Sequence, residues 1–235
     1  MSKQDNIKDN TLNKLGGTCS ILLGVSYLVI AVIYLLVPPE QQEGSGIPIG
    51  RFLESLAQNP TPLMLGYLAF AFGSLFGIGA VLAISESVRP INEGWVRWTS
   101  TLAIVGFAVN AVDWFRSVAL LPASAAAYVQ GDAAVKAALT VPGAIAHLDQ
   151  QAWVRFGAVG LWVLVVNLLA LHDGTWPKPL AYVGIALAIG NWIVVASNVV
   201  QVPSQLLRTI IVGVSVVILP PIWYIWLGLR LRKAT

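Results

Sequence analysis

The chain has 235 residues, of which 57% are hydrophobic and only 11% are charged, and its mean hydropathy is +0.75. Soluble domains carry about 25% charged residues, so this composition excludes an ordinary soluble protein and predicts a membrane protein. The net charge of +3 does not indicate nucleic acid as a partner, because the basic residues lie at the ends of apolar runs and form no basic-aromatic patch.

Six apolar runs are long enough to cross a bilayer, which needs about 20 residues in a helix. Lipid leaves the backbone only a helix or a closed barrel for its hydrogen bonds, and long continuous runs favour helices. We therefore predict one all-α domain over residues 1–235, a polytopic membrane bundle of six transmembrane helices, with spans at approximately 18–37, 63–84, 99–121, 152–171, 179–202 and 209–229.

The first run is closed by Pro38-Pro39, because proline lacks the amide proton that a helix interior needs. No small-residue cleavage pattern follows it, which indicates a retained signal anchor. Residues 40–60 are too polar to span a membrane. Apolar residues recur there at near-helical spacing, at Ile47, Ile49, Phe52, Leu53 and Leu56. This pattern predicts a short helix in the membrane interface, with a partner groove as the alternative.

In the second span, Gly73-x-x-x-Gly77 permits the close approach of another helix, which we expect to belong to the same chain. The third span has two alternatives for its end. It either leaves the hydrocarbon by Leu121, before Pro122, or continues to Val129, and the first is favoured. The depth of the polar residues near position 113 depends on this choice.

The fourth span ends at His172-Asp173-Gly174, where glycine suits a helix terminus. In the sixth span Pro220-Pro221 should bend the helix, and a static packing kink is favoured over a hinge. Cys19 is the only cysteine, so the chain cannot form an internal disulfide.

Orientation follows from the distribution of basic residues between the two sides of the membrane. With the N-terminus inside, one side collects nine basic residues: Lys3, Lys8, Lys14, Arg89, Arg97, Lys178, Arg230, Arg232 and Lys233. The other side collects four: Arg51, Lys136, Arg155 and Arg208. Both termini are therefore predicted to be cytoplasmic, and the protein is predicted to be a multi-pass protein of the bacterial inner (cytoplasmic) membrane.

Asn110, Asp113 and Arg116 place an amide, a carboxylate and a guanidinium inside an apolar run. At intervals of three residues they lie along one helix stripe, so we expect Asp113 and Arg116 to form an intrahelical ion pair. The candidate binding residues are this stripe and the asparagines of later spans: Asn110, Asp113, Arg116, Asn167, Asn191 and Asn198. The favoured interpretation is structural, with polar groups bonding between helices, and the alternative is a polar cavity for a small solute, lipid or proton.

Nothing in the sequence indicates catalysis, a metal or a cofactor. His147 and His172 are predicted on opposite sides of the membrane, so they cannot share a haem or a zinc ion. Nucleophile-elbow and glycine-rich phosphate motifs are also absent from the sequence. We therefore expect no enzyme activity and no cofactor.

Four segments carry a family resemblance. They are the glycine-led first span with Gly16-Gly17 and Leu22–Leu36, the alanine-rich region Val118–Leu139, the segment Asp149–Trp162 with Gly157 and Gly160, and the ending Pro221-Ile-Trp223-Tyr-Ile-Trp226-Leu-Gly228-Leu. With these, the chain resembles a bacterial family of six-span integral membrane proteins known only as a domain of unknown function. The resemblance implies a membrane location and supplies no activity.

The predicted function is therefore that of a non-enzymatic binding or accessory subunit in the cytoplasmic membrane. Its expected partners are the lipid bilayer and either a membrane protein or a second copy of the chain. The alternative is a small transporter or receptor for an amphiphilic solute that uses the polar cluster around Asp113 and Arg116.

Overall fold

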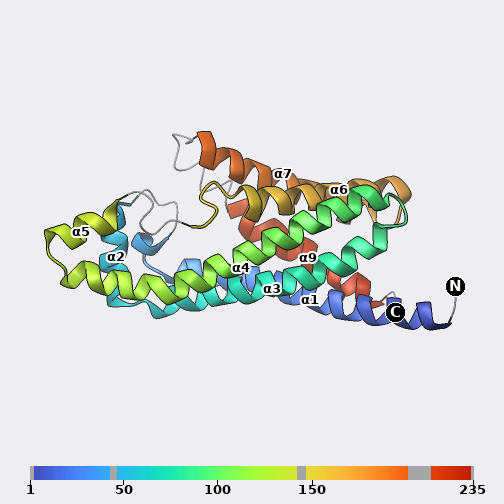
Figure 1. The fold of residues 1–235 in the computed structure, drawn as a ribbon. Coiled ribbons are helices and arrows are strands. Elements are labelled where there is room, and N and C mark those ends of the chain that lie inside the picture. Colours follow the sequence, from blue (N-terminus) through green and yellow to red (C-terminus); the bar gives the residue numbers. More distant parts are fainter. Residues whose placement is uncertain (1–2, 43–46, 142–146, 201–212, 234–235) are drawn as a thin grey trace.

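The computed structural model describes residues 3–42, 47–141, 147–200 and 213–233, and these residues form helices joined by short connections (Figure 1). The α-helices are α1 (Lys3–Leu36), α2 (Ile49–Gln58), α3 (Thr61–Val88), α4 (Glu93–Gln130), α5 (Ala133–Thr140), α6 (Val159–Asp173), α7 (Lys178–Val200) and α9 (Leu219–Lys233). A 3-10 turn, η1 (Pro39–Gln41), follows α1, and π-helical segments η2 (Trp153–Ala158) and η3 (Gly213–Ile218) lead into α6 and α9.

Five helical stretches of the described residues are long and apolar enough to cross a membrane: Thr11–Leu36, Thr61–Val88, Glu93–Gln130, Trp153–Asp173 and Lys178–Val200. They coincide with the first five predicted spans. The sixth predicted span begins outside the described residues, and its remainder forms η3 and α9. The described residues thus form an all-helical bundle with five helices of membrane-spanning type.

Two helix ends follow the sequence signals. The first helix stops at Leu36, just before Pro38-Pro39. At the end of α6, Gly174 has φ +74° and ψ +16°, a left-handed conformation that glycine adopts without a Cβ clash.

Pro122 does not end the helix, because α4 continues through it to Gln130. The expectation that the third span leaves the hydrocarbon by Leu121 stays a prediction. The part of α4 beyond the proline is held by packing. Leu121 and Ala125 are buried in one apolar cluster with Leu53 and Leu56 of α2. Burial of these side chains offsets the hydrogen bond that proline removes.

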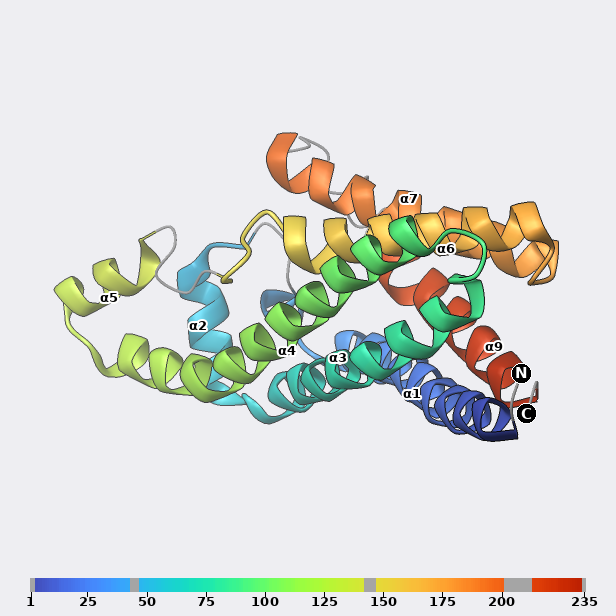
Figure 2. The ribbon, with the colours of Figure 1, turned by 45° about the vertical axis from the view of Figure 1, so that its right-hand side comes forward.

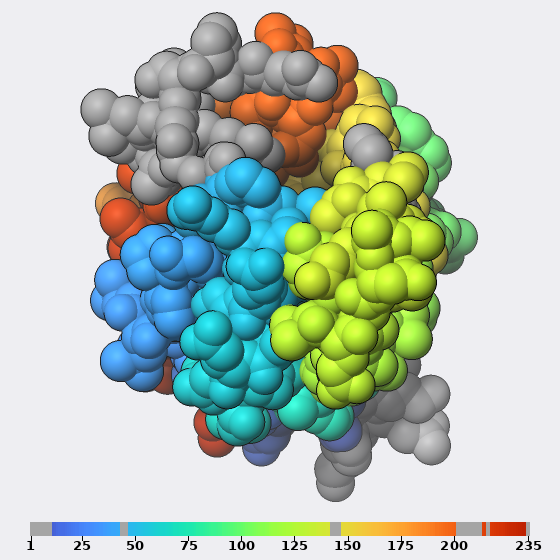
Figure 3. Space-filling model, turned by 90° about the vertical axis from the view of Figure 1, so that its left-hand side faces the viewer, coloured from blue at the N-terminus to red at the C-terminus, as the bar shows by residue number. Residues whose placement is uncertain are grey.

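The extra length of α4 builds a structure that we call the head, made of α2, residues 121–130 of α4, and α5. Figures 1 and 2 show the head at one end of the molecule, and the start of α1 and the end of α9 at the other, which we call the terminal end. Seen from the head, α2 fills the space between the end of α1 and the end of α4 (Figure 3). The predicted helix within residues 40–60 is confirmed, and the chain itself covers its apolar face, because Leu53 and Leu56 are fully buried.

The buried apolar side chains of the described residues form two cores. The larger one gathers around Trp162, Trp223 and Leu180 of α6, α9 and α7, toward the terminal end. The smaller one, which joins the head to α3 and α4, includes Tyr67 and Trp114. Residues of α4 contribute to both cores, with Phe107 in the larger and Trp114 in the smaller.

The small residues of α3 face other helices of the chain, as the sequence predicted. A side chain at Gly73 would meet Ser26 of α1, and one at Gly77 would meet Phe107 of α4. These glycines therefore serve packing within the bundle.

Pro220 and Pro221 lie in the first turn of α9, directly after the π-helical segment η3. Because proline has no N–H to donate, regular α-helical hydrogen bonds cannot form at these two positions, and the π-helical segment directly precedes them. The two prolines thus mark a junction between π and α geometry, instead of a kink in the middle of one α-helix.

Candidate functional site

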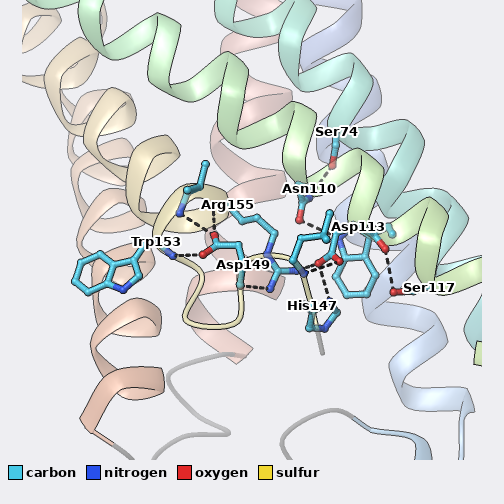
Figure 4. A network of polar contacts seen from close by, with 11 residues as sticks. Ser74, Asn110, Asp113, Ser117, His147, Asp149, Trp153 and Arg155 are labelled. Atoms are coloured by element: carbon cyan, nitrogen blue, oxygen red, sulfur yellow. Dashed lines mark hydrogen bonds and ion pairs between the residues drawn. The ribbon is translucent and has the colours of Figure 1, made fainter. Parts of the chain in front are cut away.

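Asp113 on α4 is fully buried, and groups from outside its own helix hold its carboxylate (Figure 4). Oδ2 lies 2.8 Å from Nη1 of Arg155 and 2.7 Å from Nδ1 of His147. Oδ1 accepts a hydrogen bond from the backbone N–H of Leu148 at 3.1 Å. Hydrogen bonds to a charged carboxylate are stronger than neutral ones, and these three tie α4 to the segment that precedes α6.

The ion-pair partner of Asp113 is therefore Arg155, not Arg116 as the spacing predicted. Arg155 belongs to η2, and its side chain is only 6% exposed. Arg116 is half-buried on α4 and has another interaction partner. The spacing of three residues identified residues of one stripe, but the charge of Asp113 is neutralised from the neighbouring helix.

Asp149 shapes the segment that carries Arg155. Its Oδ1 accepts from the N–H of Trp153 at 3.0 Å, and its Oδ2 accepts from the N–H groups of Val154 and Arg155 at 2.7 and 2.8 Å. The first N–H groups of a helix have no partner within it, and this carboxylate accepts hydrogen bonds from three of them. Its negative charge is also stabilised by the positive end of the helix dipole. Arg155 returns a bond from Nη2 to the carbonyl oxygen of Asp149 at 3.0 Å.

Ala152 lies between Asp149 and the helix, and its φ of 64° is unusual for a residue with a Cβ. Its side chain is also buried, with an exposed fraction of 1%. A left-handed conformation at a buried alanine persists only where the surroundings hold it. Here the Asp149 carboxylate bonds on one side and the Arg155 side chain on the other hold the turn.

Trp114 covers this cluster on the side of α3. Its ring stacks on Phe70 with centroids 5.3 Å apart and an interplanar angle of 16°, and His147 meets it edge-on at 5.2 Å. The Arg155 guanidinium lies 6.0 Å from the Trp114 ring centroid, at the limit of a cation–π contact. These aromatic rings thus cover one side of the charged cluster.

A second chain of hydrogen bonds connects the same tryptophan to α3. Trp114 Nε1 donates to Asn110 Oδ1 at 3.0 Å, and Asn110 Nδ2 donates to Ser74 Oγ at 2.7 Å. Ser74 Oγ donates in turn to the carbonyl oxygen of Phe70 at 2.8 Å. We call the whole arrangement the polar joint: Ser74, Asn110, Asp113, Trp114, His147, Asp149 and Arg155.

The structure brings only two of the predicted binding residues, Asn110 and Asp113, into the polar joint. Asn167 lies fully buried in the larger core, where its Oδ1 accepts from Trp223 Nε1 at 3.1 Å and its Nδ2 donates to the carbonyl oxygen of Val163. On α7, Asn191 is buried against Gly160 of α6, and Asn198 is half-buried. The six residues thus do not form one site.

Five residues of the polar joint were not among the candidates from the sequence: Ser74, Trp114, His147, Asp149 and Arg155. A usable signal existed, because the predicted topology placed Arg155 at the outer end of the fourth span and Asp113 near the outer end of the third. A buried carboxylate requires a cation at its own depth.

Among the residues that the structure describes, no three His, Cys, Asp or Glu side chains gather as a metal site would require.

A family model described as "Domain of unknown function (DUF4386)" matches residues 22–231, nearly the whole chain. The chain belongs to this family. The uncharacterised family that the sequence resemblance indicated is thereby confirmed. No curated protein and no solved structure matches the chain.

The whole polar joint of this DUF4386 chain, from Ser74 to Arg155, falls inside the matched residues. Chemically, both of its carboxylates are satisfied by the chain, whereas the buried Nε of Arg155 has no hydrogen-bond partner among the described residues. The Asp113 carboxylate has three donors and the Asp149 carboxylate has three donors, all from the chain itself. Such an arrangement fixes helices relative to one another, since each charge finds its partner on a different segment.

Proposed function

We propose that this DUF4386 chain is a six-span, non-enzymatic binding or accessory subunit of the cytoplasmic membrane, with both termini in the cytoplasm and the head on the outer side. The observation that carries the proposal is the head. It is a packed structure built on the part of α4 that exceeds the length of a membrane span. The polar joint then holds the head in a fixed position on the bundle.

Six spans are supported by the position of the chain ends. The start of α1 and the end of α9 lie at the same end of the molecule, which requires an even number of crossings (Figure 2). From Gly213 to Lys233, η3 and α9 together are about 30 Å long, the thickness of the hydrocarbon layer. The excess of basic residues at the terminal end supports a cytoplasmic location for that end.

Cysteine labelling tests this topology. In a Cys19→Ala background, Gln130→Cys on the head should react with an impermeant maleimide on intact cells, because this exposed residue is predicted to be outside. The matched control is Asp173→Cys at the terminal end of α6, also exposed, which should react only after lysis. Labelling of Asp173→Cys and protection of Gln130→Cys in intact cells would reverse the proposed orientation.

The length of α4 supports a head outside the bilayer. With 38 residues, the helix is about 57 Å long, whereas the hydrocarbon layer is about 30 Å thick. Even at a tilt of about 40°, the upper end of the usual range, the helix would rise about 44 Å along the membrane normal, roughly 14 Å more than the hydrocarbon layer. The last turns of α4, packed on α2, are therefore proposed to stand above the membrane.

The chemistry of the polar joint supports binding in preference to catalysis. Its carboxylates are bonded to groups of the chain, and Arg155 uses Nη1 and Nη2 within the same cluster. On the head, by contrast, Arg51 and Glu54 are exposed charges three residues apart on α2. We propose this face of α2 as the part that a protein partner contacts.

Purification from native membranes in a mild detergent tests the proposal. The wild-type chain should retain a membrane-protein partner in fixed stoichiometry, and the charge swap Arg51→Glu with Glu54→Lys should release most of it. The matched control swaps Arg97→Glu and Glu93→Lys, an exposed ion pair of 2.9 Å at the terminal end, and should keep the partner. Both swaps leave the net charge and the number of basic residues unchanged.

Two outcomes would contradict this function. If the wild-type chain purifies without a protein but with a bound small molecule, the transporter or receptor alternative replaces it. If both charge swaps release the partner equally, the head is not the contact surface.

A further inference from the structure

A groove runs along α9 on the surface of the bundle, away from both the head and the polar joint. Its volume is about 510 Å³, and apolar side chains of α1, η3 and α9 line it: Leu28, Val217, Ile218, Pro221, Ile222, Ile225, Trp226 and Leu229. Several of these are exposed although they are apolar, including Ile222 at 47% and Leu229 at 48%. In a membrane-spanning chain, such a face is covered by lipid.

At the terminal end the groove continues into a second hollow of about 490 Å³, which has a different chemistry. Trp226 and Leu229 line both spaces, and Arg230 and Lys233 complete the second one. The pairs Trp226–Arg230 and Leu229–Lys233 are four residues apart, so each cation lies one turn beyond an apolar residue on the same helix face. One stripe of α9 therefore changes from apolar to basic as it reaches the chain end.

Helix α1 contributes Leu28 to the lining of the groove, and it crosses α9 closely. The two helices approach closely at Gly17 and Gly228, and Ser20 Oγ donates to the carbonyl oxygen of Tyr224 at 2.6 Å. Leu28, which lines the groove, lies about 16 Å further along α1 toward the head. The groove thus runs from the basic end into the apolar interior of the proposed membrane layer.

We infer that this groove binds an anionic phospholipid, with an acyl chain along Ile222 and Ile225 and the phosphate at Arg230 and Lys233. Basic pockets between helices near the cytoplasmic surface suit anionic headgroups, and a tryptophan such as Trp226 suits the interface between headgroup and acyl chain. A free phosphate would use only the basic hollow, whereas the continuous apolar groove fits a lipid. The inference needs α9 in a bilayer but does not depend on the proposed partner of the head.

The test is native mass spectrometry of the full chain in detergent, titrated with equal amounts of phosphatidylglycerol and phosphatidylcholine. Wild type should retain phosphatidylglycerol in preference to phosphatidylcholine. Lys233→Gln should reduce this preference about fivefold, and the double variant Arg230→Gln, Lys233→Gln should reduce it further. Arg230 also donates to the carbonyl oxygen of Thr175 at 3.0 Å. The single variant Lys233→Gln therefore tests lipid preference without disturbing that contact.

Two further variants test whether the lipid preference depends on this groove. One removes basic charge elsewhere at the same end of the molecule, and the other fills the groove. The double variant Arg89→Gln, Arg97→Gln removes two basic residues at the same end of the molecule and should keep the preference. Ile222→Trp fills the apolar groove and should reduce the binding of both lipids. Equal retention of the two lipids by wild type, equal loss in the two double variants, or unchanged binding to Ile222→Trp would each overturn the inference.

Discussion

Replacement of Arg155 by methionine should destabilise the protein by about 3 to 5 kcal/mol, because it leaves the fully buried Asp113 carboxylate without its guanidinium. Methionine keeps much of the volume and removes the charge. The double variant Asp113→Asn, Arg155→Met should recover a large part of this loss, since both charges disappear together. Unfolding by denaturant in one detergent, carried out for both single variants and the double, gives the coupling energy as a double-mutant cycle.

An exposed ion pair on α4, the helix that carries Asp113, provides the control. Arg97 lies 2.9 Å from Glu93 on α4, with side chains that are 69% and 57% exposed. Solvent screens such a pair, so Arg97→Met should cost at most ~1 kcal/mol. If Arg155→Met and Arg97→Met lose the same small amount, the Asp113–Arg155 pair is not buried and the polar joint does not hold the bundle together.

The position of the polar joint explains why its loss should matter more than one ion pair suggests. On α4, Phe107 belongs to the larger core and Leu121 to the smaller one, with Asp113 between them. Arg155 lies just before Val159, which packs in the larger core. The ion pair therefore lies between the two cores, about two helical turns before the head. Its removal should loosen the head as well as the loop from 147 to 152.

Much of the helical architecture was predictable, because lipid makes the relevant signals local. A run of apolar residues predicts a span wherever it occurs, and Pro38-Pro39 and Gly174 mark helix ends through their own backbone chemistry. The end of α4 was not predictable in this way. Whether a helix continues past Pro122 depends on α2, whose Leu53 and Leu56 are more than 60 residues away in sequence and bury the turns that follow the proline.

The polar joint was predictable only in part, for a related reason. Helical spacing identified Asn110 and Asp113 correctly as members of one polar stripe, because that periodicity is a property of a single helix. The partner of Asp113 is 42 positions away at Arg155, and the choice between it and Arg116 depends on how two helices meet. In the same way, the bond between Asn167 and Trp223 joins residues 56 positions apart. Pairings between helices require the tertiary arrangement.

The crossing of α1 and α9 depends on the absence of a side chain at Gly228. A Cβ at this position would lie 2.6 Å from the carbonyl oxygen of Gly17 and 3.0 Å from the backbone nitrogen of Ile21. Since these are backbone atoms, they cannot move away as the end of a flexible side chain could, and the helices would have to separate. We expect Gly228→Ala to destabilise by about 1 to 3 kcal/mol through overpacking, measured by the same denaturant unfolding.

The opposite sign is expected where a helical glycine has room. At Gly94, near the start of α4, a Cβ would meet only Asn92 Oδ1, at 3.9 Å. Alanine loses less conformational freedom than glycine in a helix, so Gly94→Ala should be neutral or stabilising by up to ~1 kcal/mol. Since Gly228→Ala receives the same intrinsic benefit, any loss of stability there reports the contact with Gly17. Equal stabilisation by the two substitutions would show that α1 and α9 do not approach closely at this crossing.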